Sequence, residues 1–434
     1  SSLMAIDGAT AAGYWKQRYG ELENTVPEFS VLAKEIPFQK RKRLGQSYEF
    51  PVRLRRAHGV TFASGANSLT AFTLNAVRSG QMQRATVSGS SLVARESFAY
   101  KAVVAAMDSQ QAFGNLFDEG VRDLYNTSAF YLEGSLLYGN DAWGTFGAKP
   151  VVGAATTVDF VLTAGSSAPG LWAQMAGSRV QVNATGPVAG VWGANTAGVA
   201  NPLTCDGIDY NQATGVVTLT LTGTNAELTA ISALGGAGVG VISPFGYPDQ
   251  SMLGLSRIAG ATGAIFGINS TTYPSWAMST YDMGSAAATF GKITRAAVNI
   301  MVRDGTQDVN CYVSTATWAD INNNAAALRR LNEASARVEF GAKDVVYHGP
   351  SGRISIVAHP MVKGGEAYMG DPKENAVRIG ATDLTFNLGI QGQNQRFLRE
   401  LADSAGFEVR CLWDQGLILP RPRGWVQLTN IVNS

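Results

Sequence analysis

The chain has 434 residues, of which 45% are hydrophobic and 15% are charged. This length suits two or three domains, and the apolar content excludes a disordered polymer. Charged residues fall below the roughly 25% of typical soluble domains, so much of the surface must be covered by small polar residues or by other copies. The net charge of +1 excludes the broad basic excess of proteins that wrap nucleic acid. Near-neutrality also weakens repulsion between copies and therefore favours dense self-association.

The cysteines and the apolar runs exclude several further classes of protein. Cys205, Cys311 and Cys411 are widely spaced without a CxxC pair, which predicts buried small side chains instead of a disulfide framework or a zinc site. The chain opens without a basic-then-apolar leader, and its longest uncharged runs are interrupted by Gly, Asn, Thr and Pro. We therefore expect no signal peptide, no membrane segment and a reducing compartment.

The first hundred residues are predicted to form an arm followed by a long hairpin. Residues 1–45 have poor apolar periodicity and favour an extended or partly helical arm, with a solvated tail as the alternative. From Tyr48 to Arg55, apolar and mostly charged residues alternate with the two-residue period of a strand. A second β-prone run at 86–100 follows a stretch rich in Ser, Gly and Asn, and we expect the two runs to be the arms of one hairpin. The middle of this hairpin has too little apolar content to fold alone, so it would rest on another chain.

The clearest helix is predicted between residues 108 and 138. Apolar residues recur there at spacings of three and four, and Asp108 or Ser109 can cap the start. Gly139-Asn140 tolerates the left-handed backbone that ends many helices. Such a helix would be about 45 Å long, which exceeds most helices of globular proteins.

The composition changes after this helix. Only five charged residues lie between Pro150 and Ile242, where short β-prone runs alternate with clusters of Gly, Ser, Asn and Pro. The runs are Val158–Leu162, Arg179–Val182 and Thr214–Leu221. Their spacing predicts a small β-sandwich or barrel inserted into the parent fold.

The remainder of the chain mixes helices and strands. We expect one helix whose face is formed by Phe290, Ile293, Ala297, Ile300 and Met301 and which ends at Asp304-Gly305. The further expected elements are a strand at 309–313, a helix at 316–331, a hairpin of 345–347 with 354–358, and closing strands at 407–413 and 417–419.

No catalytic, cofactor or metal site is expected from the motifs. The sequence has no phosphate-binding P-loop, no HExxH, no GxSxG and no paired carboxylates placed for acid–base work. A metal pair of His348 and His359 with Asp344 is conceivable, but base rates favour ordinary turn and strand residues.

Arginine clusters are the best candidates for contacts with a partner. They lie on a strand and in a proline-bracketed turn without the interleaved aromatics of a nucleic-acid groove, which favours ion pairs to a neighbouring subunit over DNA contacts. The subunit-interface candidates are Arg41, Arg43, Arg53, Arg55, Arg56, Arg421, Arg423 and Trp425.

The order of these parts resembles the Hong Kong 97-type capsid fold of tailed bacteriophages, an α+β fold. Four stretches carry the likeness: Leu136–Asn140 at the end of the long helix, Met252–Leu255, Cys311–Thr315 with Trp318, and Trp425–Asn430. The resemblance leaves out residues 141–250, which would be an inserted β-rich domain. It implies an N-terminal arm at 1–45, an extended β-hairpin loop at 46–100, and a spine helix of the peripheral domain at 101–140. It also implies a continued peripheral domain at 251–314, an axial domain at 315–400, and closing peripheral strands at 401–434.

The resemblance implies a major capsid protein, which is not an enzyme, and which assembles into pentamers and hexamers of an icosahedral head. Its partners would be copies of itself, packaged double-stranded DNA without sequence preference, and possible scaffolding, portal and cement or decoration proteins. The location would be the virion, after assembly in the host bacterial cytoplasm. The founding member of the fold forms Lys–Asn crosslinks from a lysine on this loop, but Gly45 to Tyr100 contains no lysine, so this crosslink is not expected. The start at Ser1 leaves open the removal of a methionine or of a longer segment.

Two other functions remain as alternatives. An encapsulin-like nanocompartment would share the fold and differ in shell diameter and DNA content. A β-rich secreted carbohydrate-binding protein or hydrolase would suit Trp172, Trp192 and Trp276, but the missing leader and the missing carboxylate pair oppose it.

Overall fold

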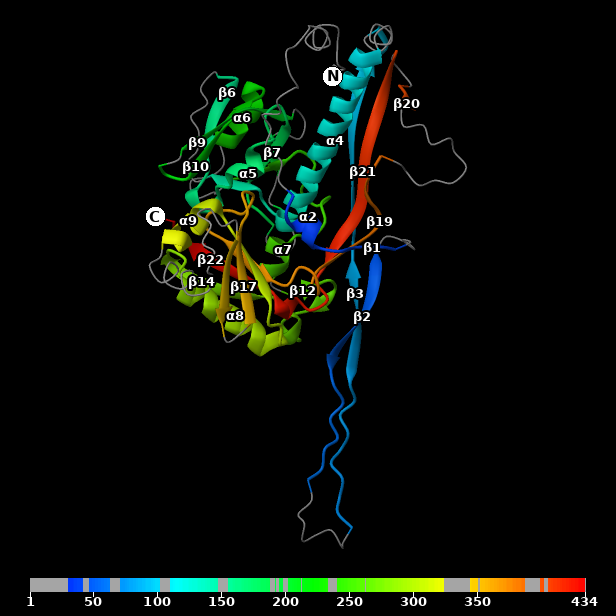
Figure 1. The fold of residues 1–434 in the computed structure, drawn as a ribbon, viewed down its shortest axis with the longest axis vertical. Coiled ribbons are helices and arrows are strands. Elements are labelled where there is room, and N and C mark those ends of the chain that lie inside the picture. Colours follow the sequence, from blue (N-terminus) through cyan, green and yellow to red (C-terminus); the bar gives the residue numbers. More distant parts are fainter. Residues whose placement is uncertain are drawn as a thin grey trace.

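The computed structural model describes residues 30–41, 47–62, 71–101, 110–146, 155–187, 192, 195–197, 202–211, 213–232, 240–261, 263–323, 344–349, 352–386, 399–401 and 405–433. Figure 1 shows a broad body of helices and sheets from which one narrow hairpin projects far to one side. Among the described residues, no helix has both the length and the apolarity needed to cross a membrane.

The projecting hairpin is built from strands β2 (Tyr48–Arg55) and β3 (Gln81–Val87). They pair antiparallel from Tyr48 opposite Val87 outward, and a bridge between His58 and Arg78 continues the pairing beyond them. The expected hairpin is confirmed, but its second arm is β3 and not the whole run 86–100. That run is divided at Ser88-Gly89, and β4 (Ser90–Ala99) turns into the body, where it pairs with a different strand.

The long helix is confirmed as α4 (Gln110–Tyr138). The expected caps, Asp108 and Ser109, lie outside the described residues. The helix ends as expected, because Asn140 has a positive φ of 52°. Beyond the last turn, the N–H of Gly254 donates to the carbonyl of Gly139 at 3.0 Å. Two segments of the backbone touch at this point, where both residues are glycines and carry no side chain.

Helix α4 lies along a five-stranded sheet (Figure 1). Its strands are β1 (Phe38–Lys40), β19 (Val377–Thr385), β21 (Gly406–Ile418) and β20 (Arg399–Glu400) in that order, with β4 also paired to β21. The two closing strands expected at 407–413 and 417–419 are in fact the single strand β21. This long strand pairs with β4 along ten residues, which gives α4 a continuous surface to pack against.

The low-charge region forms a seven-stranded sheet. Its order is β5 (Gly144–Phe146), β11 (Gly240–Pro244), β7 (Arg179–Asn183), β9 (Leu203–Asn211), β10 (Val216–Thr222) and β6 (Thr157–Val161), with β8 (Asn195–Ala197) paired to β7. A bridge between Phe146 and Leu162 connects the two end strands. The sheet therefore curls until its ends meet, which is the barrel form of the two expected forms, a small β-sandwich or a barrel. Short helices α5 (Pro169–Trp172) and α6 (Asn225–Ser232) lie within this region.

A six-stranded sheet forms the third unit. Its order is β14 (Ser279–Ala286), β22 (Val426–Ile431), β18 (Ala367–Gly370), β15 (Val309–Val313), β17 (Gly352–Ala358) and β16 (Asp344–Gly349). Helix α8 (Phe290–Asp304) buries the predicted side chains except Met301, and ends at Gly305 with a φ of 81°. Helix α9 (Thr315–Asn323) matches the start of the helix expected at 316–331, whose remainder lies outside the described residues.

Sheet membership does not follow the expected ranges for the axial and closing segments. Strand β19 lies within 315–400 but belongs to the five-stranded sheet, and β22 lies within 401–434 but belongs to the six-stranded sheet. The chain therefore crosses between these two sheets twice after residue 370. The shorter elements α7 (Leu255–Ala259), β12 (Ala264–Ile265), β13 (Ile268–Asn269), η3 (Pro274–Trp276) and η4 (Pro422–Gly424) connect the larger ones.

Candidate subunit-interface surfaces

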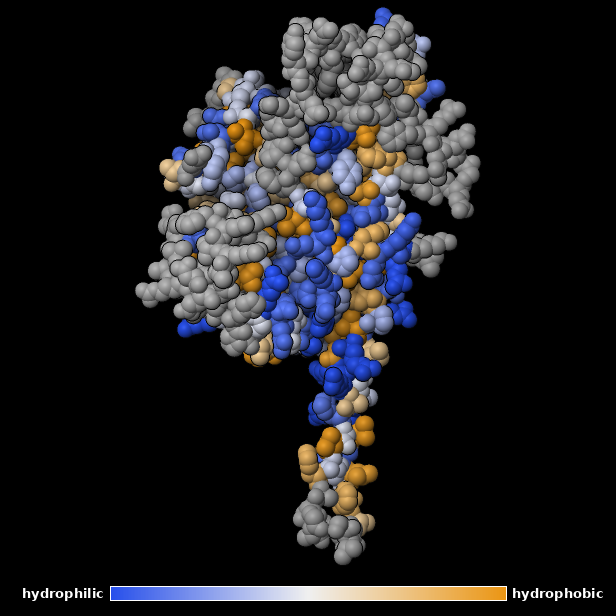
Figure 2. Space-filling model, viewed as in Figure 1, coloured by the Kyte–Doolittle hydropathy of each residue, from blue (hydrophilic) through white to orange (hydrophobic). Residues whose placement is uncertain are grey.

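The outer half of the hairpin exposes large apolar side chains. The exposed fractions are 61% for Val60, 93% for Phe62, 49% for Phe72, 73% for Leu74, 75% for Val77 and 62% for Met82. Figure 2 shows the same feature as apolar colour toward the end of the hairpin and strongly hydrophilic colour at its root. Apolar surface gathered on one projecting element is typical of a protein–protein contact. An isolated two-stranded hairpin is also only marginally stable in water, so such a contact would order it.

The root of the hairpin is rich in arginine. Among its described residues, Glu49 is the one acidic side chain, against Arg53, Arg55, Arg56, Arg78 and Arg84. Glu49 forms a 3.3 Å ion pair with Arg84, and both side chains are largely exposed. The guanidinium of Arg55 lies 5.4 Å from the centre of the Tyr273 ring, close enough for a cation–π contact. The hairpin thus offers positive charge at the root and apolar surface further out.

The arginine interface candidates in the first sixty residues differ in whether the structure describes them and where they lie. Arg41 is exposed, and its backbone N–H donates to the carbonyl of Gly380 at 2.8 Å. Arg43 lies outside the described residues. Arg53 and Arg56 are exposed on and just beyond β2. The structure therefore brings Arg53, Arg55 and Arg56 together.

Arg421 and Arg423 already have a partner within the chain. The carboxylate of Asp304 is fully buried and accepts from Arg423 Nε at 2.9 Å, while Arg421 approaches its other oxygen at 3.2 Å. Asp304 is the last residue of α8, where a negative charge opposes the helix dipole, so the two guanidinium groups stabilise an otherwise unfavourable end. The side chains remain 41% and 39% exposed, which leaves part of each guanidinium free for another partner.

Trp425 is not a surface residue, and its assignment as an interface candidate was wrong. It is fully buried, its indole N–H donates to the carbonyl of Asn375 at 3.0 Å, and its ring lies against Gly370. The neighbouring Arg421 and Arg423 suggested a surface position. They do reach the surface, but Trp425, which follows them at the end of the turn, points inward.

A buried carboxylate, missed by sequence reasoning, anchors the start of the described chain. Glu133 of α4 is fully buried and accepts the backbone N–H groups of Val31 (2.9 Å), Leu32 (2.6 Å) and Ala33 (2.8 Å). These groups form the first turn of the short helix α2 (Leu32–Glu35), whose N–H groups lack partners within the helix. The fourth bond comes from His359 Nε2 at 2.7 Å. Burial acts to raise the pKa of Glu133, but the bonds from His359, Ala33 and Leu32 outweigh it and lower the pKa.

The other end of α2 is held by a buried cation. Arg378 Nε donates to the carbonyl of Ile36 at 3.1 Å, and its guanidinium also donates to Asp383 (2.9 Å) and to Gln415 (3.2 Å). Opposite charges therefore lie at the ends of α2 that the helix dipole favours. The signal for Glu133 was present in the sequence, because it is the single charge in the otherwise apolar or small stretch Thr127–Tyr138.

The conceivable metal pair does not form in this structure. His359 is buried against Glu133, and its ring N atoms already have partners. The side chain of His348 lies outside the described residues. Within the described part of the chain, no cluster of three or more His, Cys, Asp or Glu side chains could hold a metal ion.

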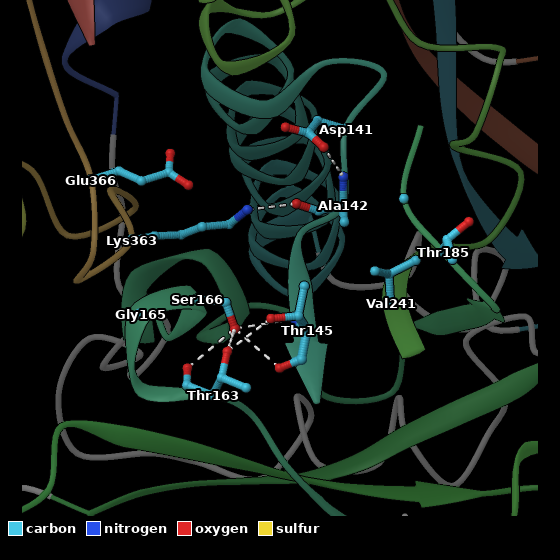
Figure 3. Close-up of a pocket in the computed structure, with 11 residues that line it drawn as sticks. Asp141, Ala142, Thr145, Thr163, Gly165, Ser166, Thr185, Val241, Lys363 and Glu366 are labelled. Atoms are coloured by element: carbon cyan, nitrogen blue, oxygen red, sulfur yellow. Dashed lines mark hydrogen bonds between the residues drawn. The ribbon is translucent and has the colours of Figure 1, made fainter. Parts of the chain in front are cut away.

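A polar cavity of about 640 Å³ lies between the end of α4 and the curled sheet (Figure 3). Lys363 reaches across it and donates to the carbonyl of Ala142 at 2.7 Å, while the hydroxyls of Thr145 and Thr163 bond each other at 2.8 Å on another wall. Glu366 accepts from the hydroxyl of Tyr368 at 2.5 Å. These polar groups already bond protein atoms, and their arrangement does not pair a nucleophile with a base.

The cysteines are buried, as expected. Burial raises the pKa of Cys205 to about 11 and that of Cys311 to about 12, and it also raises the pKa of Cys411. Thiolates, the reactive form, are therefore disfavoured at all three sites.

The tryptophans that suited a carbohydrate-binding protein are also buried. Trp172 is 0%, Trp192 8% and Trp276 3% exposed, so none offers a ring face for stacking on a sugar.

Comparison with solved structures identifies the fold. Over 98% of both chains, the structure is similar to a chain of the capsid asymmetric unit of cyanophage A-1(L), with 12% identity and a TM-score of 0.52. The chain has a Hong Kong 97-type capsid fold. It is also similar to a chain from the capsid of a native GTA particle (10% identity, 99% and 100% of the two chains, TM-score 0.48). A chain from the capsid of cyanophage P-SCSP1u gives 12% identity, 98% and 95% of the two chains, and a TM-score of 0.44. No known protein family and no curated protein matches the sequence.

Two of the sequence stretches that carried the resemblance touch each other in the structure. The end of the long helix and the segment 252–255 touch through Gly139 and Gly254. A Cβ at Gly139 would lie 2.1 Å from the carbonyl oxygen of Met252, so both glycines are required for this approach.

Proposed function

We propose that the chain is the major capsid protein of a tailed bacteriophage. Copies would assemble into pentamers and hexamers of an icosahedral head that encloses double-stranded DNA, and the protein would not act as an enzyme. The observation that carries the proposal is the projecting hairpin, which exposes Phe62 at 93% and Leu74 at 73% on a chain with a capsid fold. Side chains of this size are normally buried against something, and the body of the same chain does not cover them.

The hairpin would lie over an adjacent copy. Its apolar outer half would supply buried area, and Arg53, Arg55 and Arg56 at its root would pair with carboxylates of that copy. Arg41, with the exposed parts of Arg421 and Arg423, would add contacts elsewhere. In this arrangement α4 is the spine helix, the curled sheet of 141–250 is the inserted domain, and the six-stranded sheet belongs to the axial domain.

Other partners follow from the assembly of a head. They are the packaged DNA, bound without sequence preference, and a portal, a scaffolding protein and a cement or decoration protein. The virion is the final location, and the host bacterial cytoplasm is the place of assembly.

Expression of the full chain in bacteria, followed by light scattering and negative-stain imaging, tests the proposal. Closed shells of uniform diameter are expected. A stable 45.8 kDa monomer at high concentration would refute self-assembly. Small shells that enclose protein and no DNA would instead identify a nanocompartment.

A gel under denaturing conditions tests the missing crosslink. Because Gly45 to Tyr100 contains no lysine, shells should dissociate on boiling into a single 45.8 kDa band. A ladder of covalent oligomers would contradict this part of the proposal.

A further inference from the structure

The contact between Glu133 and His359 joins three segments that are far apart in sequence. Glu133 lies on α4, His359 follows β17 of the six-stranded sheet, and the N–H groups that Glu133 accepts belong to residues 31–33. Both side chains are fully buried. One carboxylate therefore holds the N-terminal segment 30–41 to two different structural units.

The hydrogen bonds define the protonation states of the pair. His359 Nδ1 accepts the N–H of Met361 at 3.2 Å, so it carries no hydrogen, and Nε2–H is the donor to Glu133. Glu133 accepts four N–H donors, and hydrogen bonds of this kind favour the ionised form of its carboxyl group.

A proton on Glu133 would break this arrangement. Protonation removes the negative charge that strengthens all four N–H bonds, since hydrogen bonds to an ionised group are roughly twice as strong as neutral ones. Three of the donors lie on Oε1 and the N–H of Ala33 lies on Oε2, so a proton on Oε1 would also displace one of the three donors there.

We propose that the Glu133–His359 pair is an acid-sensitive latch, which holds segment 30–41 on the body when Glu133 is ionised and releases it when Glu133 is protonated. The latch is a property of the single chain and does not depend on the proposed assembly.

Other titratable groups surround the latch. On α2, Glu35 accepts from the hydroxyl of Tyr312, which belongs to β15, and Lys34 is exposed. The remaining groups on neighbouring elements are Tyr138 of α4, Lys363 after β17 and Arg378 of β19. Among the described residues of segment 30–41, Glu35 is the one carboxyl group, so it is the competing explanation for a response to acid.

The sign of the pH dependence follows from the lowered pKa of Glu133. A carboxyl group whose pKa lies below its ordinary value of 4.5 stabilises the folded arrangement above that value, and the stabilisation is lost as the pH falls through the lowered pKa. The latch should therefore be closed above about pH 5 and open progressively below it.

Hydrogen–deuterium exchange of the full-length chain between pH 7 and pH 3.5 tests the latch. The protection of amides 31–36, relative to amides of β17, should fall by up to about tenfold over this range, because the stabilisation linked to a carboxyl group with an ordinary pKa of 4.5 changes by at most a factor of ten per pH unit below that value. Glu133→Gln should show low relative protection at every pH and lose the response to acid. His359→Gln keeps an N–H donor and serves as a second variant if Glu133→Gln does not fold.

Glu35→Gln is the matched control, because it removes the other carboxyl group on the same segment. It should retain the fall in protection. If the response disappears in Glu35→Gln, or if amides 31–36 stay protected to pH 3.5 while β17 is intact, the latch assigned to Glu133 is wrong.

Discussion

The clearest test of the hairpin is the replacement Phe62→Ser. Phe62 is 93% exposed in the single chain, and full burial of such a side chain contributes about 1.5–3 kcal/mol. Loss of the phenyl group should therefore weaken each contact between copies by about 2 kcal/mol. Since 1.4 kcal/mol corresponds to a factor of ten, the threshold concentration for assembly should rise about 30-fold. Adding Leu74→Ser, at a site 73% exposed, should bring the rise to on the order of 1000-fold.

The assay is light scattering of purified full-length chain over a range of concentrations, with thermal unfolding of the unassembled subunit measured beside it. Thr73→Ser is the matched control, because it changes an exposed polar residue next to Leu74 and keeps its character. The unfolding midpoint should be the same in all variants, since these side chains do not pack on their own subunit. An unchanged assembly threshold in Phe62→Ser, or a lowered midpoint, would refute the reasoning.

Three further predictions concern the body and the root of the hairpin. Gly139→Ala should lower the unfolding free energy by about 3 kcal/mol or more, because the new methyl group would lie 2.1 Å from a backbone carbonyl oxygen. Gly291→Ala is the control, because a Cβ at this helical position would have no atom within 4 Å, and it should be neutral or stabilising by about 0.5–1 kcal/mol. Denaturant unfolding measures the difference between the two alanine variants. Trp425→Ala should cost about 3–5 kcal/mol in the same measurement; a cost under about 1 kcal/mol would place the ring outside the core. Arg53→Glu with Arg56→Glu should leave the subunit stable but suppress assembly most strongly at low salt, and a salt-independent effect would argue against ion pairs to a neighbour.

Local patterns in the sequence predicted the elements whose contacts are periodic. The helix α4 and the strand β15 appear at the expected residues because apolar spacing depends on the geometry of one element alone. The end at Asn140 and the end at Gly305 were equally predictable, since both need a left-handed backbone. The fold class came from the resemblance of this order of elements to a known capsid fold.

Pairing between strands was harder to predict. The run 86–100 reads as one β-prone stretch, yet its first two residues pair with β2 and the rest with β21, which is more than 300 residues away. Alternation tells which face of a strand is buried but does not identify its partner. The same limit explains why the expected range 401–434 holds β21 and β22 together, although the two strands lie in different sheets.

Buried charges were the least predictable part of the interface candidates. Arg421 and Arg423 appeared to need an external partner, because Asp304 is more than 100 residues earlier in the chain. Glu133 showed the opposite problem, since its four donors come from two segments that no local pattern connects. A single charge within an apolar helical stretch is the one sign of such a site that a sequence offers.

The buried charges of the body and the exposed apolar side chains of the hairpin divide the chain into a part that folds alone and a part that depends on neighbours. The body contains three buried charged side chains that have their partners within the same chain: Glu133, Arg378 and Asp304. Removing the partner of any of them would lower the unfolding free energy by several kcal/mol. Among the described residues of the hairpin, no such contact lies beyond its root, and the outer half is joined there by one bridge and by the bonds of Asn75 to residues 60 and 61. Its order must therefore come from whatever covers Phe62 and its neighbours. If that cover is another copy, assembly will order the hairpin without changing the body, and exchange protection should rise in residues 56–62 and 71–80 alone when shells form.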